Sequence, residues 1–194
     1  MLGSIDCMHW EWRNCPKALH GQFKRRDHKY PTLMLEVVAD QRLWIWHTFF
    51  GVPGANNDLN VLYGSPLFDD ELVDTAPECP FVVNGHTYRK GYYLADGIYP
   101  AWSTFVKSFS VARDESLKEF KKLQGKILNE LSEYFKDEGF EVNVRDLFVS
   151  PTPQIQRTWV ERCELHLRKS KELRDRKTHI DLRQDLVEHL WNNH

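Results

Sequence analysis

Two runs of β-forming residues, Thr32–Ala39 and Leu43–Phe50, are separated only by Asp40, Gln41 and Arg42. Branched and aromatic side chains favour strands, and such a short polar connection favours an antiparallel hairpin. A chain that carries this pair of strands near its start is not a helical bundle. The hairpin therefore sets the fold class, and the other elements must pack around it.

The neighbouring segments alternate between strand and helix patterns. Residues 3–12 form a further expected strand, and residues 13–30 form a polar, basic loop. Later strands are expected at 81–83, 87–88 and 92–96, and helices at 56–63, capped by asparagine, and at 100–107, with proline in the first turn. This order predicts an α/β fold with a mixed sheet and flanking helices.

The composition changes near residue 112. Residues 1–112 hold 18 of the 25 Phe, Trp and Tyr residues, whereas residues 113–194 hold 32 of the 54 charged ones. We therefore expect a core over 1–112 and a charged helical C-terminal tail over 113–194. Capping-box patterns at 116–119 and 178–181 predict helices over 117–138 and 178–191, and a third is expected around Trp159, Val160, Cys163 and Leu167.

The charge and the apolar pattern exclude several classes of protein. With 26 basic and 28 acidic residues, the net charge of −2 argues against a histone-like binder. No apolar run reaches the roughly 18 to 20 residues that cross a bilayer, and the first residues lack the pattern of a signal peptide. The four cysteines show no framework spacing, so we expect reduced thiols in an intracellular protein.

Two aspartates, Asp6 and Asp96, are expected at the ends of predicted strands. A carboxylate at such a position leaves the core and faces solvent, where catalytic and metal-binding groups are common. Two carboxylates on neighbouring strands repel each other, and Mg²⁺ or Mn²⁺ would relieve that repulsion. A solvated turn residue is the alternative for either one.

Other polar groups also have two interpretations. His9 is expected on the same face as Asp6, either near a metal-bound phosphate or as a core or supporting histidine. Asp58 is a supporting carboxylate or, as we prefer, a helix N-cap. Cys7, His9, Cys15 and His20 do not have a familiar zinc spacing. The basic loop either contacts DNA phosphates or is simply solvated, and its cations are Lys17, Lys24, Arg25, Arg26, His28 and Lys29.

The tryptophans of the predicted strands raise the same question. Trp10, Trp12, Trp44 and Trp46 could stack on nucleic-acid bases. Their alternating spacing favours the other interpretation, in which they form the core on one face of a sheet.

Several long motifs resemble the transposase domain of PIF/Harbinger-type plant elements, the plant transposon protein family. These are GSIDCMHWEWRNCP (3–16), LEVVADQRLWIWHTFFGVPGANNDLNVL (35–62), SPLF (65–68) and YYLADGIYPAWSTFVKS (92–108), with a weaker match at 174–191. The resemblance implies a nuclear protein with an RNase H-like fold. It also implies an Asp-Asp-Glu triad that holds two Mg²⁺ or Mn²⁺ ions for DNA strand cleavage and joining.

Carried over by position, the first two acids of the triad match Asp6 and Asp96. The third, a helical Glu in the family, falls on Ser132, and Glu130 and Glu133 flank it as candidates. From the resemblance we also expect that the family's later helices are replaced over 136–173 and that the DNA-binding segment that usually precedes the domain is missing. The chain thus resembles a truncated or rearranged copy.

Two functional classes follow. One is a metal-dependent DNA-cleaving enzyme, catalytically impaired by the missing acid. The other is a non-catalytic domesticated or relic protein that binds DNA or other proteins. DNA, a separate DNA-binding protein and a second copy of the chain are the expected partners, and no membrane is. Self-association would involve the apolar stripe of the last helix, with intrachain packing of that stripe as the alternative.

Overall fold

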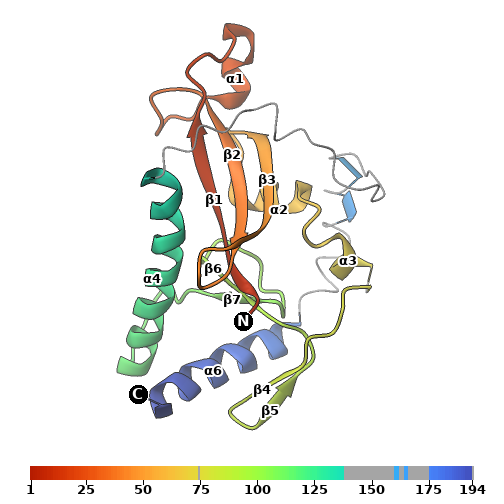
Figure 1. Cartoon of the computed structure of the whole chain (residues 1–194), viewed down its shortest axis with the longest axis vertical. Coiled ribbons are helices and arrows are strands. Elements are labelled where there is room, and N and C mark those ends of the chain that lie inside the picture. The colour runs from red at the N-terminus through yellow and green to blue at the C-terminus, as the bar shows by residue number, and fades with distance from the viewer. Residues whose placement is uncertain (74, 138–159, 162–163, 166–174, 194) are drawn as a thin grey trace.

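The computed structural model describes residues 1–73, 75–137, 160–161, 164–165 and 175–193. A five-stranded sheet with the order β3-β2-β1-β6-β7 is flanked by helices, and a small β4-β5 hairpin lies beside it (Figure 1). The elements are β1 Gly3–Glu11, η1 Lys17–Leu19, α1 His20–Phe23, β2 Thr32–Ala39, β3 Ile45–Pro53, α2 Asp58–Gly64, α3 Asp69–Leu72, β4 Phe81–Val83, β5 His86–Tyr88, β6 Tyr93–Ala95, β7 Phe105–Lys107, α4 Glu115–Asp137 and α6 Arg176–Asn193.

The sheet is mixed, as the sequence predicts. β1, β2 and β3 pair antiparallel, which confirms the hairpin, whereas β6 pairs parallel to both β1 and β7. The parallel pairing joins Gly3 to Tyr93 and Ser4 to Leu94. Residues far apart in the sequence therefore meet at the centre of the sheet.

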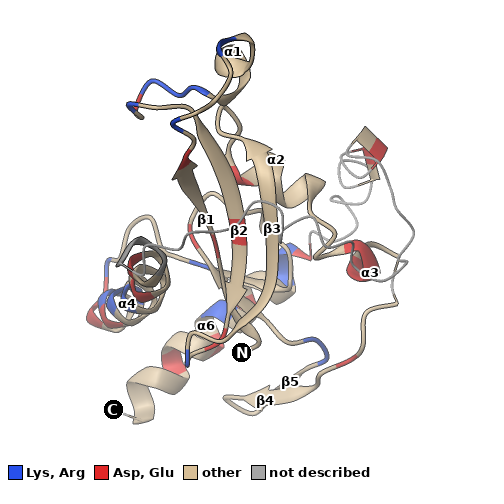
Figure 2. Ribbon diagram, turned by 45° about the horizontal axis from the view of Figure 1, so that its top comes forward, with Lys and Arg blue, Asp and Glu red and all other residues tan. Residues whose placement is uncertain are grey.

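Each face of the sheet packs against a different helix. On one face, Leu35 and Val37 form a core cluster with Leu131 of α4. On the other face, Ile5 and Val38 cluster with Leu62 of α2 and with aromatic residues of the 99–105 segment. Side chains of a strand alternate between these faces, so the faces are assigned residue by residue. Figure 2 shows α4 standing to one side of β1 and β2.

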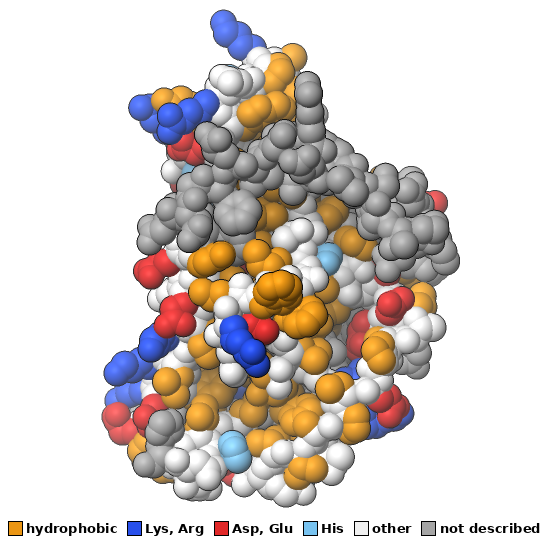
Figure 3. Space-filling model, viewed as in Figure 1, with side chains coloured by type: hydrophobic (Ala, Val, Ile, Leu, Met, Phe, Trp, Pro, Cys, Tyr) orange, Lys and Arg blue, Asp and Glu red, His pale blue; other side chains and the backbone are white. Residues whose placement is uncertain are grey.

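Two irregularities shape β3, the strand at the edge of the sheet. The register with β2 shifts between Val38 and Ala39 and again between Met34 and Leu35, so that Trp46 and Gly51 have no opposite residue. These are β-bulges, which re-aim side chains at sheet edges. Trp44 and Trp46 are 65% and 67% exposed, so the prediction that they form core is wrong for this pair. Figure 3 shows hydrophobic side chains gathered on this face of the molecule.

The prediction of a helix over 100–107 is wrong. Residues 105–107 instead form β7, which pairs with β6. Phe105 packs in the cluster on the α2 side of the sheet, and Val106 packs in a cluster with α4 and α6. This alternation is typical of a strand, and the sheet contact overrides the helix-start signal of Pro100.

The charged tail forms helices, but their starts differ from the capping-box predictions. α4 begins at Glu115, so Ser116 lies inside the helix rather than at its cap. α6 begins at Arg176, and the carboxylate of Asp175 accepts hydrogen bonds from the backbone and hydroxyl of Thr178. Of the helix expected near 159–167, residues 160–161 and 164–165 are helical, whereas Trp159, Cys163 and Leu167 lie outside the described residues.

The apolar stripe of α6 packs within the chain. Leu182, Leu186 and Val187 are buried in one cluster with Val106 of β7 and Phe120 of α4. Intrachain packing is thus confirmed for these residues, while Trp191 remains 51% exposed. Association of α6 with another molecule stays a prediction. No helix in the described ranges combines the length and apolar character needed to cross a membrane.

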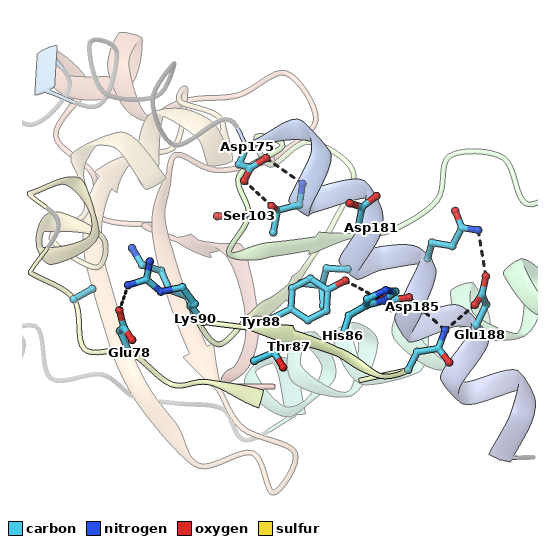
Figure 4. A pocket seen from close by; sticks show the side chains of 16 residues that line it. Glu78, His86, Thr87, Tyr88, Lys90, Ser103, Asp175, Asp181, Asp185 and Glu188 are labelled. Carbon is cyan, nitrogen blue, oxygen red and sulfur yellow. Dashed lines mark hydrogen bonds and ion pairs between the residues drawn. The ribbon is translucent and has the colours of Figure 1, made fainter. Parts of the chain in front are cut away.

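A polar cluster also fixes α6 to the β4-β5 hairpin. The buried Asp185 accepts hydrogen bonds from the Tyr88 hydroxyl, from His86 Nδ1 at 2.8 Å and from Asn84 Nδ2 at 3.3 Å (Figure 4). A cavity of about 950 Å³ lies between the hairpin and the helix. Its lining includes neither Asp6 nor Asp96.

Candidate functional site

Asp6 lies in β1, and Asp96 comes directly after the neighbouring strand β6, while the predicted closeness of their carboxyl groups stays a prediction. Continuing the parallel register from Ser4 and Leu94 by two residues brings Asp6 level with Asp96. Asp96 directly follows the last residue of β6, whereas Asp6 lies inside β1 and not at its end, contrary to expectation. Both side chains are half-buried. The strand order therefore places two carboxylates where β1 extends beyond the end of β6.

Hydrogen bonds fix the backbone at both acids. Asp6 Oδ1 accepts from the backbone N–H of Cys7 at 2.9 Å, and Asp96 Oδ1 accepts from that of Ile98 at 2.9 Å. The buried Gln124 of α4 donates through Nε2 to the backbone oxygens of Ala95, at 3.3 Å, and Val106, at 2.8 Å. Gln124 thus joins the ends of β6 and β7 directly before Asp96.

Two charged side chains lie within electrostatic range of Asp96. Burial and the positive charge of Arg183 lower the pKa of the half-buried Lys107, and the charge of Asp96 opposes that shift. Burial also raises the pKa of Asp58 to about 6, and Asp96 adds to the rise while Arg25 opposes it. The charge of Asp96 therefore acts on a cation, Lys107, and on a second carboxyl group, Asp58.

Asp58 is not the helix N-cap that we preferred. Asn57 caps α2, because its side chain accepts a hydrogen bond from the backbone N–H of Asn60 at 2.9 Å. Asp58 is the first residue of the helix and is half-buried. The asparagine beside it takes the capping role, and the half-buried Asp58 carboxyl group is within electrostatic range of Asp96 and Glu36.

Replacing Asp58 by asparagine is expected to remove a pH-dependent loss of stability. The raised pKa means that the proton on Asp58 stabilises the folded protein below about pH 4, and this contribution is lost as the pH rises through about 6. Because Asp58 is partly exposed and screened by solvent, we expect its protonation to contribute only roughly 1 kcal/mol to the free energy of unfolding. Thermal unfolding should therefore show Asp58→Asn melting about 2–4 °C above the parent at pH 7.5 and level with it at pH 4. An equal difference at both pH values would contradict this, and the exposed Asp181→Asn is the control.

His9 does not share a face with Asp6, contrary to our expectation. His9 is the third residue after Asp6 along β1, so alternation places the two side chains on opposite faces. His9 Nε2 lies 3.0 Å from Nη1 of Arg25, which can only donate, so Nδ1 donates to the Thr32 hydroxyl at 2.9 Å. Burial and the charges of Arg25 and His28 lower the pKa of His9 to about 4. His9 is a neutral supporting residue for the basic loop.

Neither candidate for the third acid faces the sheet. Leu131 is the residue of α4 that packs on the sheet at this level, and it is 1% exposed. Glu130 and Glu133 flank it on the exposed side of α4, where Glu130 pairs with Lys126 at 3.7 Å. Ser132 is half-buried. Within the described part of α4, neither Glu130 nor Glu133 therefore points toward Asp6 and Asp96.

Within the described ranges, no group of three or more His, Cys, Asp or Glu side chains could hold a metal ion. The zinc set is not assembled either. His20 Nε2 lies 3.1 Å from the backbone oxygen of Cys15, and Cys7 Sγ lies 3.5 Å from the Tyr99 hydroxyl. Two carboxylates remain as the candidate ligands of a hard cation.

The basic loop extends from the far end of β1. Figure 2 shows its basic residues in blue beside α1. The guanidinium group of Arg25 already has partners within the chain, because it pairs with Asp27 at 2.9 Å and contacts His9. Lys17, Lys24, Arg26 and Lys29 are exposed, although the ammonium groups of Lys24 and Lys29 contact the Lys29 carbonyl and the Tyr30 ring. Exposed cations fit both interpretations of the loop, contact with phosphate and simple solvation, so DNA binding by this loop stays a prediction.

Sequence reasoning missed Glu36. This glutamate lies in the middle of β2 and is 0% exposed, with Oε1 3.3 Å from Nε2 of His47. Burial raises the pKa of Cys7 well above its usual range, and the charge of Glu36 adds to the rise. A lone glutamate inside the apolar run LMLEVVA was the signal that could have revealed it. Glu36 therefore adds a second acidic group, besides Asp58, on the α2 side of the sheet.

The fold and the site define a mixed α/β protein with a carboxylate pair at the junction of two parallel strands. The family model described as plant transposon protein matches residues 1–135, and the chain belongs to that family. The chain is therefore transposase-derived. No curated protein and no solved structure matches it.

Proposed function

We propose that this chain is a nuclear protein of RNase H-like fold whose Asp6 and Asp96 hold one Mg²⁺ or Mn²⁺ ion, and whose DNA cleavage is impaired. The parallel pairing of Ser4 with Leu94 carries this proposal, because the same register continued by two residues would set Asp6 level with Asp96. The mixed five-stranded sheet with flanking helices supports the fold, and membership of the plant transposon protein family supports DNA as the substrate.

Two carboxylates fit one hard cation whose other ligands are water and phosphate oxygens. A bound divalent ion would stabilise negative charge on a phosphate group. Around it, the chain supplies Lys107 close to Asp96 and the exposed cations of the basic loop, which attract the DNA backbone. These groups would bind and orient a strand without any further acid.

The outward direction of Glu130 and Glu133 favours a second candidate function. A two-ion centre needs accurately placed ligands, and a missing acid leaves one ion weakly held. A domesticated or relic protein that binds DNA or other proteins, but does not cleave DNA, would keep the sheet and lose the third acid of the triad. We propose this as the alternative.

A thermal-shift titration with Mn²⁺ tests the cation site. An ion that binds only the folded state at about 100 times its Kd adds roughly 2.7 kcal/mol, which is about 5–10 °C for a chain of this size. We expect the melting temperature of the parent to rise with Mn²⁺, and Asp6→Asn and Asp96→Asn to abolish the rise. Asp181→Asn, on the exposed side of α6, should retain it.

No Mn²⁺ shift in the parent, or an unchanged shift in both variants, would exclude this site. The same preparations should nick supercoiled plasmid no faster than Asp96→Ala does. Rapid Mg²⁺-dependent nicking that Asp96→Ala eliminates would contradict the impaired state and support an active nuclease.

A further inference from the structure

We infer that Gln124 of α4 is a positioning residue, which sets the places of Asp96 and Lys107 through the peptide groups that directly precede them. Its Nε2 donates to the backbone oxygens of Ala95 at 3.3 Å and Val106 at 2.8 Å. Ala95 is the last residue of β6, and Val106 lies in β7. The inference rests on the cation site proposed above, and it adds a residue outside that site on which the site depends.

The buried position of Gln124 is unusual for a polar side chain. α4 runs along the sheet (Figure 1), and its buried residues Phe120 and Leu131 pack in two different core clusters. Gln124 lies between them, one turn after Phe120, and is only 2% exposed. Its Oε1 is buried without a hydrogen-bond partner among the described residues, which makes the amide costly at this place. Stability alone therefore does not account for a glutamine here.

The two acceptors belong to the peptide groups that lead into Asp96 and Lys107. A carbonyl oxygen lies in one rigid plane with the nitrogen and the Cα atom of the residue that follows it. A donor that fixes the oxygen of Ala95 therefore also fixes the Cα atom of Asp96, and a donor to Val106 fixes that of Lys107. One side chain of α4 thus orients the charged residues at the ends of two parallel strands.

Further contacts join the same two strand ends. The backbone N–H of Ser108 donates to the oxygen of Ala95 at 3.1 Å, so that oxygen accepts from both β7 and α4. In the turn that follows, a Cβ atom at Gly97 would lie 3.8 Å from Ser108 Oγ, and Asp96 Oδ1 accepts from the backbone N–H of Ile98 at 2.9 Å. The carboxyl group of Asp96 is thereby connected to the helix through a short series of hydrogen bonds.

A neutral amide suits this junction better than a charged side chain does. Burial lowers the pKa of Lys107 and the charge of Asp96 opposes that shift, so these two groups interact. A carboxylate at position 124 would repel the two carbonyl oxygens, and an ammonium group would bring another cation close to Lys107. Glutamine supplies two N–H donors from one nitrogen without a net charge. It can therefore orient Asp96 without adding charge beside it.

The arrangement gives α4 a role in the carboxylate site, although Glu130 and Glu133 face away from it. Residues that hold metal ligands in place are often as important as the ligands, and their loss typically weakens metal binding about 10–100-fold. We expect Gln124 to act in this way on Asp96.

The variant Gln124→Met tests the inference, because methionine has a similar length and donates no hydrogen bond. Amide hydrogen exchange, measured by NMR on the full chain in EDTA, reports on the junction without any cation. We expect the amides of Ser108 and Ile98 to exchange about fivefold or more faster relative to that of Tyr93. Tyr93 donates to the oxygen of Thr104, at the start of β6, and serves as the internal reference.

The affinity for Mn²⁺, followed by electron paramagnetic resonance of the free ion, tests the consequence for the site. We expect about tenfold weaker binding in Gln124→Met. Leu131→Ala removes a buried side chain of α4 that packs against β2, so it should lower the melting temperature but keep the parent's affinity and exchange ratios. Gln124→Asn, whose amide is one methylene closer to the helix, should change both readouts in the same direction as methionine, and it replaces that variant if methionine prevents folding.

Unchanged exchange ratios in a folded Gln124 variant would overturn the inference. Equal acceleration of the Tyr93 amide would do so as well, because it would mean that Gln124 only supports the fold. Where the parent binds Mn²⁺, an unchanged affinity in Gln124→Met is a third contradictory result. If the parent binds no Mn²⁺, the proposed cation site fails, whereas the exchange ratios in EDTA still decide whether Gln124 positions the two strand ends.

Discussion

Replacing Leu182 by alanine is expected to lower the free energy of unfolding by about 2–5 kcal/mol, the usual range for a buried leucine. Leu182 is 1% exposed and packs with residues of β4, β6, β7 and α4. The cavity left behind cannot collapse easily, because a sheet, a hairpin and a helix surround it. The loss should therefore fall near the upper part of this range.

The matched control lies two residues away on the same helix. Ile180 is 50% exposed, so Ile180→Ala should change stability by less than about 0.5 kcal/mol. Urea unfolding followed by circular dichroism measures both. Similar small effects for the two variants would mean that α6 does not pack on the sheet in solution, and would revive association with another molecule.

Replacing Asp185 by alanine is expected to cost about 2–4 kcal/mol. The change leaves the buried Tyr88 hydroxyl without its acceptor and removes the contacts of His86 and Asn84 that join α6 to the hairpin (Figure 4). Burial alone would raise the pKa of Asp185, but the hydrogen bonds from these three residues outweigh it and lower the pKa. The stabilisation is therefore present above the unfolded pKa and is lost as the pH falls through the lowered folded value.

Asp181 provides the comparison for this prediction. It lies one turn earlier on α6 and is exposed, so Asp181→Ala should be close to neutral. Thermal unfolding at pH 7 should separate the two variants by several degrees. A separation that disappears with Tyr88→Phe already in place would assign the cost to the Tyr88 hydroxyl. A neutral Asp185→Ala would contradict the role of this cluster.

The strands of this chain were largely readable from the sequence, because β-branched and aromatic residues concentrate in them. The β2-β3 hairpin, the strand at 81–83 and the helix after Asn57 occur as expected. The prediction of a helix over 100–107 failed because Pro100 is a local signal, whereas the pairing of residues 105–107 with β6 depends on a distant part of the fold. The exposure of Trp46 was also hidden, since a bulge depends on how β3 aligns with β2.

The candidate site was only partly readable. The adjacency of Asp6 and Asp96 followed from the resemblance and the strand-end argument, and the register of β1 with β6 agrees with it. The acidic role of Asp58 was masked by the more familiar capping interpretation, which Asn57 fills. Glu36 could be placed only once the two faces of β2 were known, because its effect depends on what lies opposite in space.

The parallel pairing of β1 with β6 sets an order for the folding of this chain. The β1-β2-β3 meander joins segments close in the sequence, and it can form early at a small cost in loop entropy. We expect the pairing of Gly3 with Tyr93 to form later, because it closes a far longer loop, and the burial of Val106 in β7 to be completed with residues 176–193. Before these steps the ends of β6 and β7 would expose apolar side chains. We therefore expect Asp6 and Asp96 to be brought together late, after the meander has formed.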